Sequence, residues 1–310
     1  MDSSKPHPSG TTPSMPRRAF IGAAGAGLAS APCWLDAARV LAHPRASLAT
    51  VEEKGTLRLG LVTYNLAKDW DIETIIGNCV KTGFEGVELR TTHAHGVEVT
   101  LDSARRDEVK KRFRDSGVEL ASLGSAFEFQ SMDPAEVRRN IDGAKEYARL
   151  AADVGAKGMK VRPNGIPGGA SEDAVARQIG RSLAEVGEAA SAVGVEVRVE
   201  VHGNGTSRLP ILKKILDIAS HPNVFVCWNS NPTDLEDGGF DANFELVKDR
   251  IRFVHMRDLY LEDYPFRKLL ASLRRNGYAG YCCAEIPESK DPVRLMLYYR
   301  ALFRAYQDLI

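Results

Sequence analysis

Short runs rich in β-branched residues alternate with longer segments of helical periodicity from Leu57 to the C-terminus. This alternation is typical of a parallel sheet built from strand–helix units. Eight strands are expected, at residues 57–62, 86–89, 119–123, 158–161, 196–201, 224–228, 252–256 and 281–286. Eight units in about 254 residues match a closed (β/α)8 barrel of roughly 250 residues. We therefore expect an α/β fold, with a single TIM-barrel domain over residues 55–310. An open doubly wound sheet is the competing architecture, but no Gly-rich nucleotide-binding motif follows the first strand.

Helix boundaries in this region carry recognisable signals. Asp133-Pro134 and Ser171-Glu172-Asp173 are expected to begin helices, because an acceptor side chain and an early proline suit a helix N-terminus. Five glycines are expected to end helices before the next strand. They are Gly83, Gly117, Gly155, Gly194 and Gly277.

The first fifty residues differ from the rest of the chain. They are rich in Ser, Pro, Gly and Ala, and residues 16–21 read PRRAFI before a weakly apolar run at residues 22–31. This pattern predicts a twin-arginine signal peptide and linker over residues 1–50. We then expect the domain to be exported to the periplasm by the twin-arginine machinery. The apolar run is too short for a spanning helix of roughly 20 residues, so no stable membrane span is expected after cleavage. A disordered basic tail is the alternative.

Charge and cysteine content limit the classes of partner. Lys and Arg together number 41 and Asp and Glu also number 41, so no basic excess is available to bind a long nucleic acid. A small-molecule substrate is favoured, and a homo-oligomer is compatible with the sequence. The five cysteines lack metal-binding or disulfide-framework spacing, and we interpret them as packing residues.

Polar residues at the ends of apolar strands indicate where chemistry takes place, because catalytic groups of such barrels lie at the C-terminal ends of strands. Glu200, Asn229, His255 and Glu285 follow one another at spacings of 29, 26 and 30 residues, about one strand–helix unit each. They can therefore converge. Two carboxylates, an imidazole and an amide oxygen suit one divalent ion, Mn²⁺, Mg²⁺, Co²⁺ or Zn²⁺. Taken singly, each residue could instead cap a loop, form an ion pair or pack in the core.

At these positions the chain resembles the xylose isomerase-like TIM-barrel superfamily, which includes sugar phosphate isomerases/epimerases and ketose 3-epimerases. The resemblance covers residues 57–310 and is carried by residues 86–90 (GVELR), 200–203 (EVHG), 226–229 (VCWN), 254–258 (VHMRD) and 284–285 (AE). With its predicted export signal, the chain is similar to an exported subgroup of that superfamily.

The resemblance implies that Glu200, His255 and Glu285 hold the metal ion. Asn229 stands where the family usually has Asp, which removes one negative charge and should weaken metal binding or alter the choice of metal. Asn231 is a second candidate ligand, and the His that ketose 3-epimerases place just after this strand is missing. The implied activity is a metal-dependent sugar isomerase or epimerase, in which Glu200 and Glu285 remove and return a proton next to the sugar carbonyl.

Further residues are expected around this centre. Lys160 is a catalytic candidate, since it and the nearby cations Arg162 and Arg257 could neutralise an enediolate or hold an anionic substituent; surface ion pairing is their alternative role. Expected substrate contacts also include Glu88, Arg90, His202, Trp228, Asn231 and Tyr64. Among these, Glu88 could instead pair with Arg90 or Lys160, His202 could orient a metal ligand, and the aromatic rings could simply pack in the core.

Three other functions use the same features. A lyase or deglycosidase acting on keto-glycosides needs the same proton abstraction. A non-catalytic sugar-binding protein would explain Asn229 as the mark of a lost metal site. An endonuclease IV-like phosphodiesterase needs a three-metal cluster rich in His and Asp, and the chain, with seven His in all, is poorly supplied for it.

Overall fold

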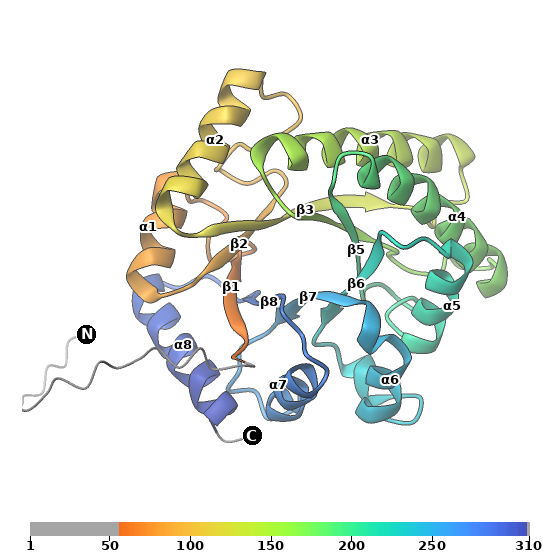
Figure 1. Ribbon diagram of the computed structural model, residues 1–310. Helices are drawn as coiled ribbons and strands as arrows, with labels where there is room; N and C mark the ends of the chain where they lie inside the picture. The colour runs from red at the N-terminus through yellow and green to blue at the C-terminus, as the bar shows by residue number, and fades with distance from the viewer. Residues whose placement is uncertain (1–55, 309–310) are drawn as a thin grey trace, which may run out of the picture. The chain divides into compact units, whose positions relative to one another are not determined.

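The computed structural model describes residues 56–308, which form a closed barrel of eight parallel strands surrounded by helices (Figure 1). The strands follow one another around the barrel in chain order, and β1 pairs with β8 to close it. They are β1 (Arg58–Val62), β2 (Gly86–Arg90), β3 (Glu119–Glu128), β4 (Gly158–Arg162), β5 (Glu196–Glu200), β6 (Val224–Asn229), β7 (Ile251–Met256) and β8 (Tyr281–Ala284). The predicted TIM barrel is confirmed, and closure excludes the open sheet.

Each strand is followed by a helix on the outside of the barrel. The helices are α1 (Ile72–Thr82), α2 (Ser103–Ser116), α3 (Pro134–Val154), α4 (Glu172–Ser191), α5 (Leu209–Ala219), α6 (Phe240–Val247), α7 (Phe266–Arg275) and α8 (Pro292–Asp308). Two short 3₁₀ helices, η1 (Pro232–Leu235) and η2 (Lys248–Arg250), flank α6.

The predicted helix boundaries are largely found. The Asp133 side chain accepts a hydrogen bond from the amide of Ala135 at the start of α3. Gly83, Gly117 and Gly155 adopt left-handed conformations at the ends of α1, α2 and α3, as a glycine does at little steric cost. Gly194 and Gly277 have positive φ angles in the turns after α4 and α7.

Apolar side chains pack in two layers, one between strands and helices and a smaller one inside the barrel. Cys282 belongs to the outer layer and its neighbour Cys283 to the inner one, because successive side chains of a strand point to opposite faces. Cys79 and Cys227 are also buried and unpaired by disulfides, which agrees with a packing role. Cys33 lies outside the described residues.

The predicted signal segment, residues 1–50, also lies outside the described residues. Within residues 56–308, no helix has the length and apolar character needed to span a membrane.

Candidate active site

A cavity of about 600 Å³ opens at the C-terminal ends of the strands. Of the thirteen residues that the sequence analysis places at the site, twelve line this cavity or lie directly next to it, because they occupy inward-facing positions of their strands or of the loops that continue them. The cavity is lined by Tyr64, Arg90, Lys160, Arg162, Glu200, His202, Asn229, Asn231, Arg257, Asp258, Leu261, Glu285 and Pro287. Glu88 and His255 are fully buried next to it.

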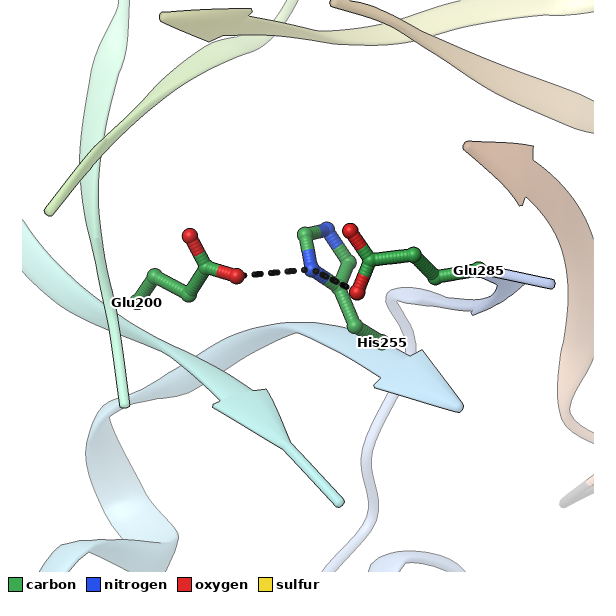
Figure 2. Close-up of side chains that lie close together, drawn as sticks. All are labelled: Glu200, His255 and Glu285. Atoms are coloured by element: carbon green, nitrogen blue, oxygen red, sulfur yellow. Dashed lines mark ion pairs between the residues drawn. The ribbon is translucent and has the colours of Figure 1, made fainter. Parts of the chain in front are cut away.

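Glu200, His255 and Glu285 point toward one another (Figure 2). Glu200 and Glu285 line the cavity, and His255 is buried next to it. Nδ1 of His255 lies 3.5 Å from Oε1 of Glu200 and 3.6 Å from Oε2 of Glu285. Glu200 ends β5 and His255 lies in β7, whereas Glu285 comes directly after β8, where its amide donates to the carbonyl of Met256 at 2.9 Å. The predicted convergence of these three strands is therefore found.

The donor set fits a divalent cation. Nδ1 of His255 is buried and has no hydrogen-bond partner in residues 56–308, although two carboxylate oxygens lie near it. Ligand atoms that bind one ion at about 2.1 Å are themselves roughly 3 to 3.5 Å apart. Two carboxylates also supply the charge that a divalent ion needs, and a buried imidazole nitrogen without a hydrogen bond is costly. The site therefore has the atoms, spacing and charge of a metal centre.

Asn229 lies beside this cluster, opposite His255 in the register of β6 and β7. Its amide nitrogen is 3.4 Å from Oε1 of Glu200. The nitrogen and oxygen of an amide exchange by a rotation of the side chain, so the oxygen can turn toward the same region. Asn229 is placed to contribute a neutral ligand, without the charge that an Asp would bring.

Lys160 forms a buried ion pair with Glu200, with Nζ 2.7 Å from Oε2. Burial disfavours the charge of Glu200, but Lys160 and His255 outweigh it and hold the pKa of Glu200 well below its usual range. The pKa of Lys160 is raised because the attraction of Glu200 and Glu88 exceeds the effect of burial. Both groups are therefore charged at neutral pH.

Glu88 closes the other side of His255, with Oε1 3.2 Å from Nε2. Both side chains are completely buried. A carboxylate next to the second nitrogen orients the imidazole ring and increases its basicity, as is common for metal-binding histidines. This geometry favours support of His255 over the expected contact with substrate hydroxyls.

By contrast, burial raises the pKa of Glu285, whose side chain is 15% exposed. The charges of His255, Lys160 and Arg90 offset part of this effect. Glu285 thus differs from Glu200, since it lacks a lysine partner in the described residues and faces the cavity.

The remaining wall residues are held by the loops. Nδ1 of His202 is 2.8 Å from the side-chain oxygen of Asn164, and burial lowers the pKa of His202. The side-chain nitrogen of Asn231 donates a hydrogen bond to the backbone carbonyl of Val201. This bond holds the Asn231 side chain away from the position of a metal ligand.

Arginines complete the wall. Arg257 donates from Nε to the carbonyl of Ser230 at 2.9 Å and pairs with Asp263, and Arg162 pairs with Glu128. The guanidinium carbon of Arg90 lies 5.2 Å from the centre of the Tyr64 ring.

Trp228 does not line the cavity, contrary to expectation. Its indole is completely buried in the outer layer, packs against Phe240 and Phe244, and donates from Nε1 to the hydroxyl of Tyr264 at 2.9 Å. The reason is alternation along β6: because Asn229 points inward, its neighbour Trp228 must point outward.

Two features of the site were not expected from the sequence. Asp258 lines the cavity from the loop after β7. Asp234 is fully buried behind the site. Its side chain accepts hydrogen bonds from the Tyr264 hydroxyl at 2.6 Å and from the backbone N–H of Asn231 at 3.2 Å. An acidic residue in a short polar segment carries no sequence signal of burial, so periodicity could not find Asp234.

The family model of the xylose isomerase-like TIM barrel matches residues 76–305. The chain therefore belongs to the xylose isomerase-like TIM-barrel family. No curated protein matches the sequence.

Solved structures with the same fold include several sugar epimerases. An L-ribulose 3-epimerase superposes with a TM-score of 0.70 at 17% identity, covering 82% of this chain and 95% of that one. The 3-keto-D-glucoside 4-epimerase of E. coli, in its apo form, has a TM-score of 0.67 at 16% identity, covering 81% and 100%. The IolI protein with a bound zinc atom has a TM-score of 0.65 at 16% identity, covering 81% and 96%. At these identities the likeness establishes the shared fold.

Proposed function

We propose that the protein is a metal-dependent isomerase or epimerase that moves a proton next to the carbonyl of a sugar or sugar-like polyol. The observation that carries this proposal is the convergence of Glu200, His255 and Glu285 beside a cavity large enough for a sugar. The epimerases and the zinc-containing protein among the structures of the same fold support it.

The residues divide the work between holding an ion and moving a proton. Glu200, His255 and Glu285 would hold the ion, with Asn229 as a neutral neighbour. A bound divalent ion supplies the electrophile that polarises the substrate carbonyl. Glu285 faces the cavity and is the candidate base at the substrate carbon.

Glu200 has a different part from the one expected by analogy. Its Oε2 is bound to the ammonium group of Lys160, so this oxygen is not directed to a substrate carbon. Lys160 thus acts through Glu200, which it keeps ionised and oriented. The second proton carrier of an epimerase would then be another wall residue, and His202, two residues after Glu200, also lines the cavity.

Elimination from a keto-glycoside is the second candidate reaction, because it begins with the same proton abstraction by Glu285. The two reactions are distinguished by product analysis with a 3-keto-glycoside: an epimer retains the aglycone, whereas elimination releases it.

Metal content and proton exchange test the proposal. Elemental analysis of the full chain should find about one divalent ion per chain, lost in Glu200→Gln and Glu285→Gln and retained in Glu262→Gln, an exposed control after β7. Ketoses incubated with the loaded protein in D₂O should gain deuterium at the carbon next to the carbonyl. A protein that binds no ion after incubation with Mn²⁺, Co²⁺ or Zn²⁺ would instead be a binding protein.

We also propose that residues 1–50 direct export by the twin-arginine pathway. The support is the PRRAFI motif at residues 16–21 and the weakly apolar run after it. Replacing Arg17 and Arg18 by Lys should keep the protein in the cytoplasmic fraction, whereas the wild type is recovered from the periplasm. Equal distribution of both would contradict export by this route.

A further inference from the structure

The cavity wall carries four cationic side chains, Arg90, Lys160, Arg162 and Arg257. Three of them are already paired with carboxylates of the protein. Their partners are Glu200 for Lys160, Glu128 for Arg162 and Asp263 for Arg257. These three cations therefore have structural roles before any substrate binds.

Arg90 is different, since it forms no ion pair with a carboxylate among residues 56–308. Its guanidinium group lies over the ring of Tyr64, and its Nε is buried without a hydrogen-bond acceptor. A buried N–H without an acceptor is costly, and a charged one more so. The side chain is thus held at the wall with donors available to a ligand.

The neighbouring strand makes room for Arg90. Gly124 of β3 lies between Arg90 and Lys160 in the register of the sheet. A side chain at Gly124 would approach Cγ of Arg90 to 3.0 Å and Oε1 of Glu88 to 2.8 Å. Glycine at this position therefore lets the arginine extend along the wall toward the metal-binding cluster.

The cations of the cluster would also balance its carboxylates without the positive charge of Arg90. The three carboxylates Glu88, Glu200 and Glu285 would be balanced by Lys160 together with one bound divalent ion, and Asn229 adds no charge. Arg90 is then a positive charge that forms no ion pair with a carboxylate of residues 56–308, in a half-buried position where an anion is attracted strongly.

We propose that the substrate is an acidic sugar, whose carboxylate or phosphate group is bound by Arg90 while its carbonyl faces the Glu200–His255–Glu285 cluster. This inference rests on the proposed function and names its substrate class. The planar guanidinium fork can bind two oxygens of either anion side by side, and it lies over the Tyr64 ring, which offers it a cation–π contact.

Binding of inert polyols tests the inference without turnover. The probes are D-gluconate, D-glucitol 6-phosphate and the neutral D-glucitol, titrated by calorimetry into the full-length, Mn²⁺-loaded protein. One acid should bind roughly 10- to 100-fold more tightly than D-glucitol, as expected for a charge-assisted contact. Preference for gluconate identifies a carboxylate, and preference for the phosphate identifies a sugar phosphate.

Variants assign this preference to Arg90. In Arg90→Gln the acid should lose its advantage, in Arg90→Lys it should keep part of it, and in Arg181→Gln, an exposed control on α4, it should be unchanged. An acid preference that persists in Arg90→Gln would show that the ion, not Arg90, binds the acid, and would overturn the inference. Equal binding of all three polyols, or none at all, would also overturn it. Failure of the proposed function is seen separately, as absence of bound metal.

Discussion

The ammonium nitrogen of Lys160 lies 2.7 Å from Oε2 of Glu200, and both side chains are almost completely buried. A buried ion pair contributes little net stability compared with apolar residues, but loss of one partner leaves a buried charge uncompensated. Lys160 therefore matters most when no cation occupies the neighbouring cluster.

Lys160→Met should lower the free energy of unfolding of the metal-free protein by about 3 to 5 kcal/mol. Addition of Mn²⁺ should recover part of this loss, because the ion would neutralise Glu200. Urea unfolding with and without metal measures both values. Lys157→Met, at an exposed site just before β4, is the control and should change stability by less than about 0.5 kcal/mol. Equal losses in the two variants would show that the buried pair has no special role.

Asn229→Asp should have opposite effects on the metal-free and metal-loaded protein. The new carboxylate would lie where the amide nitrogen is now 3.4 Å from Oε1 of Glu200, so the metal-free protein should lose stability by charge repulsion. Metal affinity should rise by about tenfold or more, since a charged ligand replaces a neutral one. Competition with a fluorescent chelator measures the affinity. A lower affinity in the variant would mean that Asn229 faces away from the ion.

Asp234 should make stability fall as the pH rises. Burial raises the pKa of Asp234 to about 8, although hydrogen bonds from Tyr264 and Asn231 oppose the shift. The unfolded chain loses this proton near pH 4 and the folded protein keeps it up to about pH 8, so the folded state binds more protons in between. Each pH unit in this window costs up to about 1.4 kcal/mol.

Asp234→Asn removes that titration while keeping an oxygen acceptor for Tyr264. The free energy of unfolding of the variant and of the wild type is measured by urea at several pH values. The difference between the two should grow in favour of the variant from pH 4 to pH 8 and remain constant above pH 8. A constant difference across the window would show that Asp234 is ionised in the folded protein.

Gly203 should not tolerate a side chain. Its φ is +92°, and an added Cβ would lie 2.4 Å from the backbone nitrogen of Gly165 in the loop after β4. Because that contact is with backbone, Gly203→Ala should cost about 2 to 4 kcal/mol and disturb His202 next to it. Gly96→Ala is the matched control, with φ of +67° but no atom within 4 Å of the added Cβ. It should cost only about 1 kcal/mol in urea unfolding. Similar losses would show that strain, not contact, is responsible.

The alternation of side chains along a strand separates the site residues that were placed correctly from Trp228, which was not. Glu200, Asn229, His255 and Glu285 were expected to converge because each lies at or next to the C-terminal end of a strand of a closed barrel. Trp228 fails because it precedes Asn229 directly, and neighbouring residues of one strand cannot both face the interior. This error was visible in the sequence itself.

The partners of the site residues needed the coordinates. Lys160 was expected near the substrate. Only the pairing of β4 with β5 in the structure shows that its ammonium group forms an ion pair with Glu200. Glu88 had several open roles, and the closed barrel places it across from His255, on a strand far from it in the chain. Such pairings depend on strand tilt and stagger around the barrel, which periodicity does not encode.

The sequence by itself determined the barrel, its eight strand–helix units, the buried cysteines and the strands that carry the metal-binding candidates. These follow from local patterns, because hydrophobic period, glycine caps and strand-end polarity act within one unit. The tertiary structure alone decided which charges neutralise one another and that Arg90 has no carboxylate partner among residues 56–308. The physical reason is that electrostatic pairing depends on distances of a few ångströms between side chains far apart in the chain.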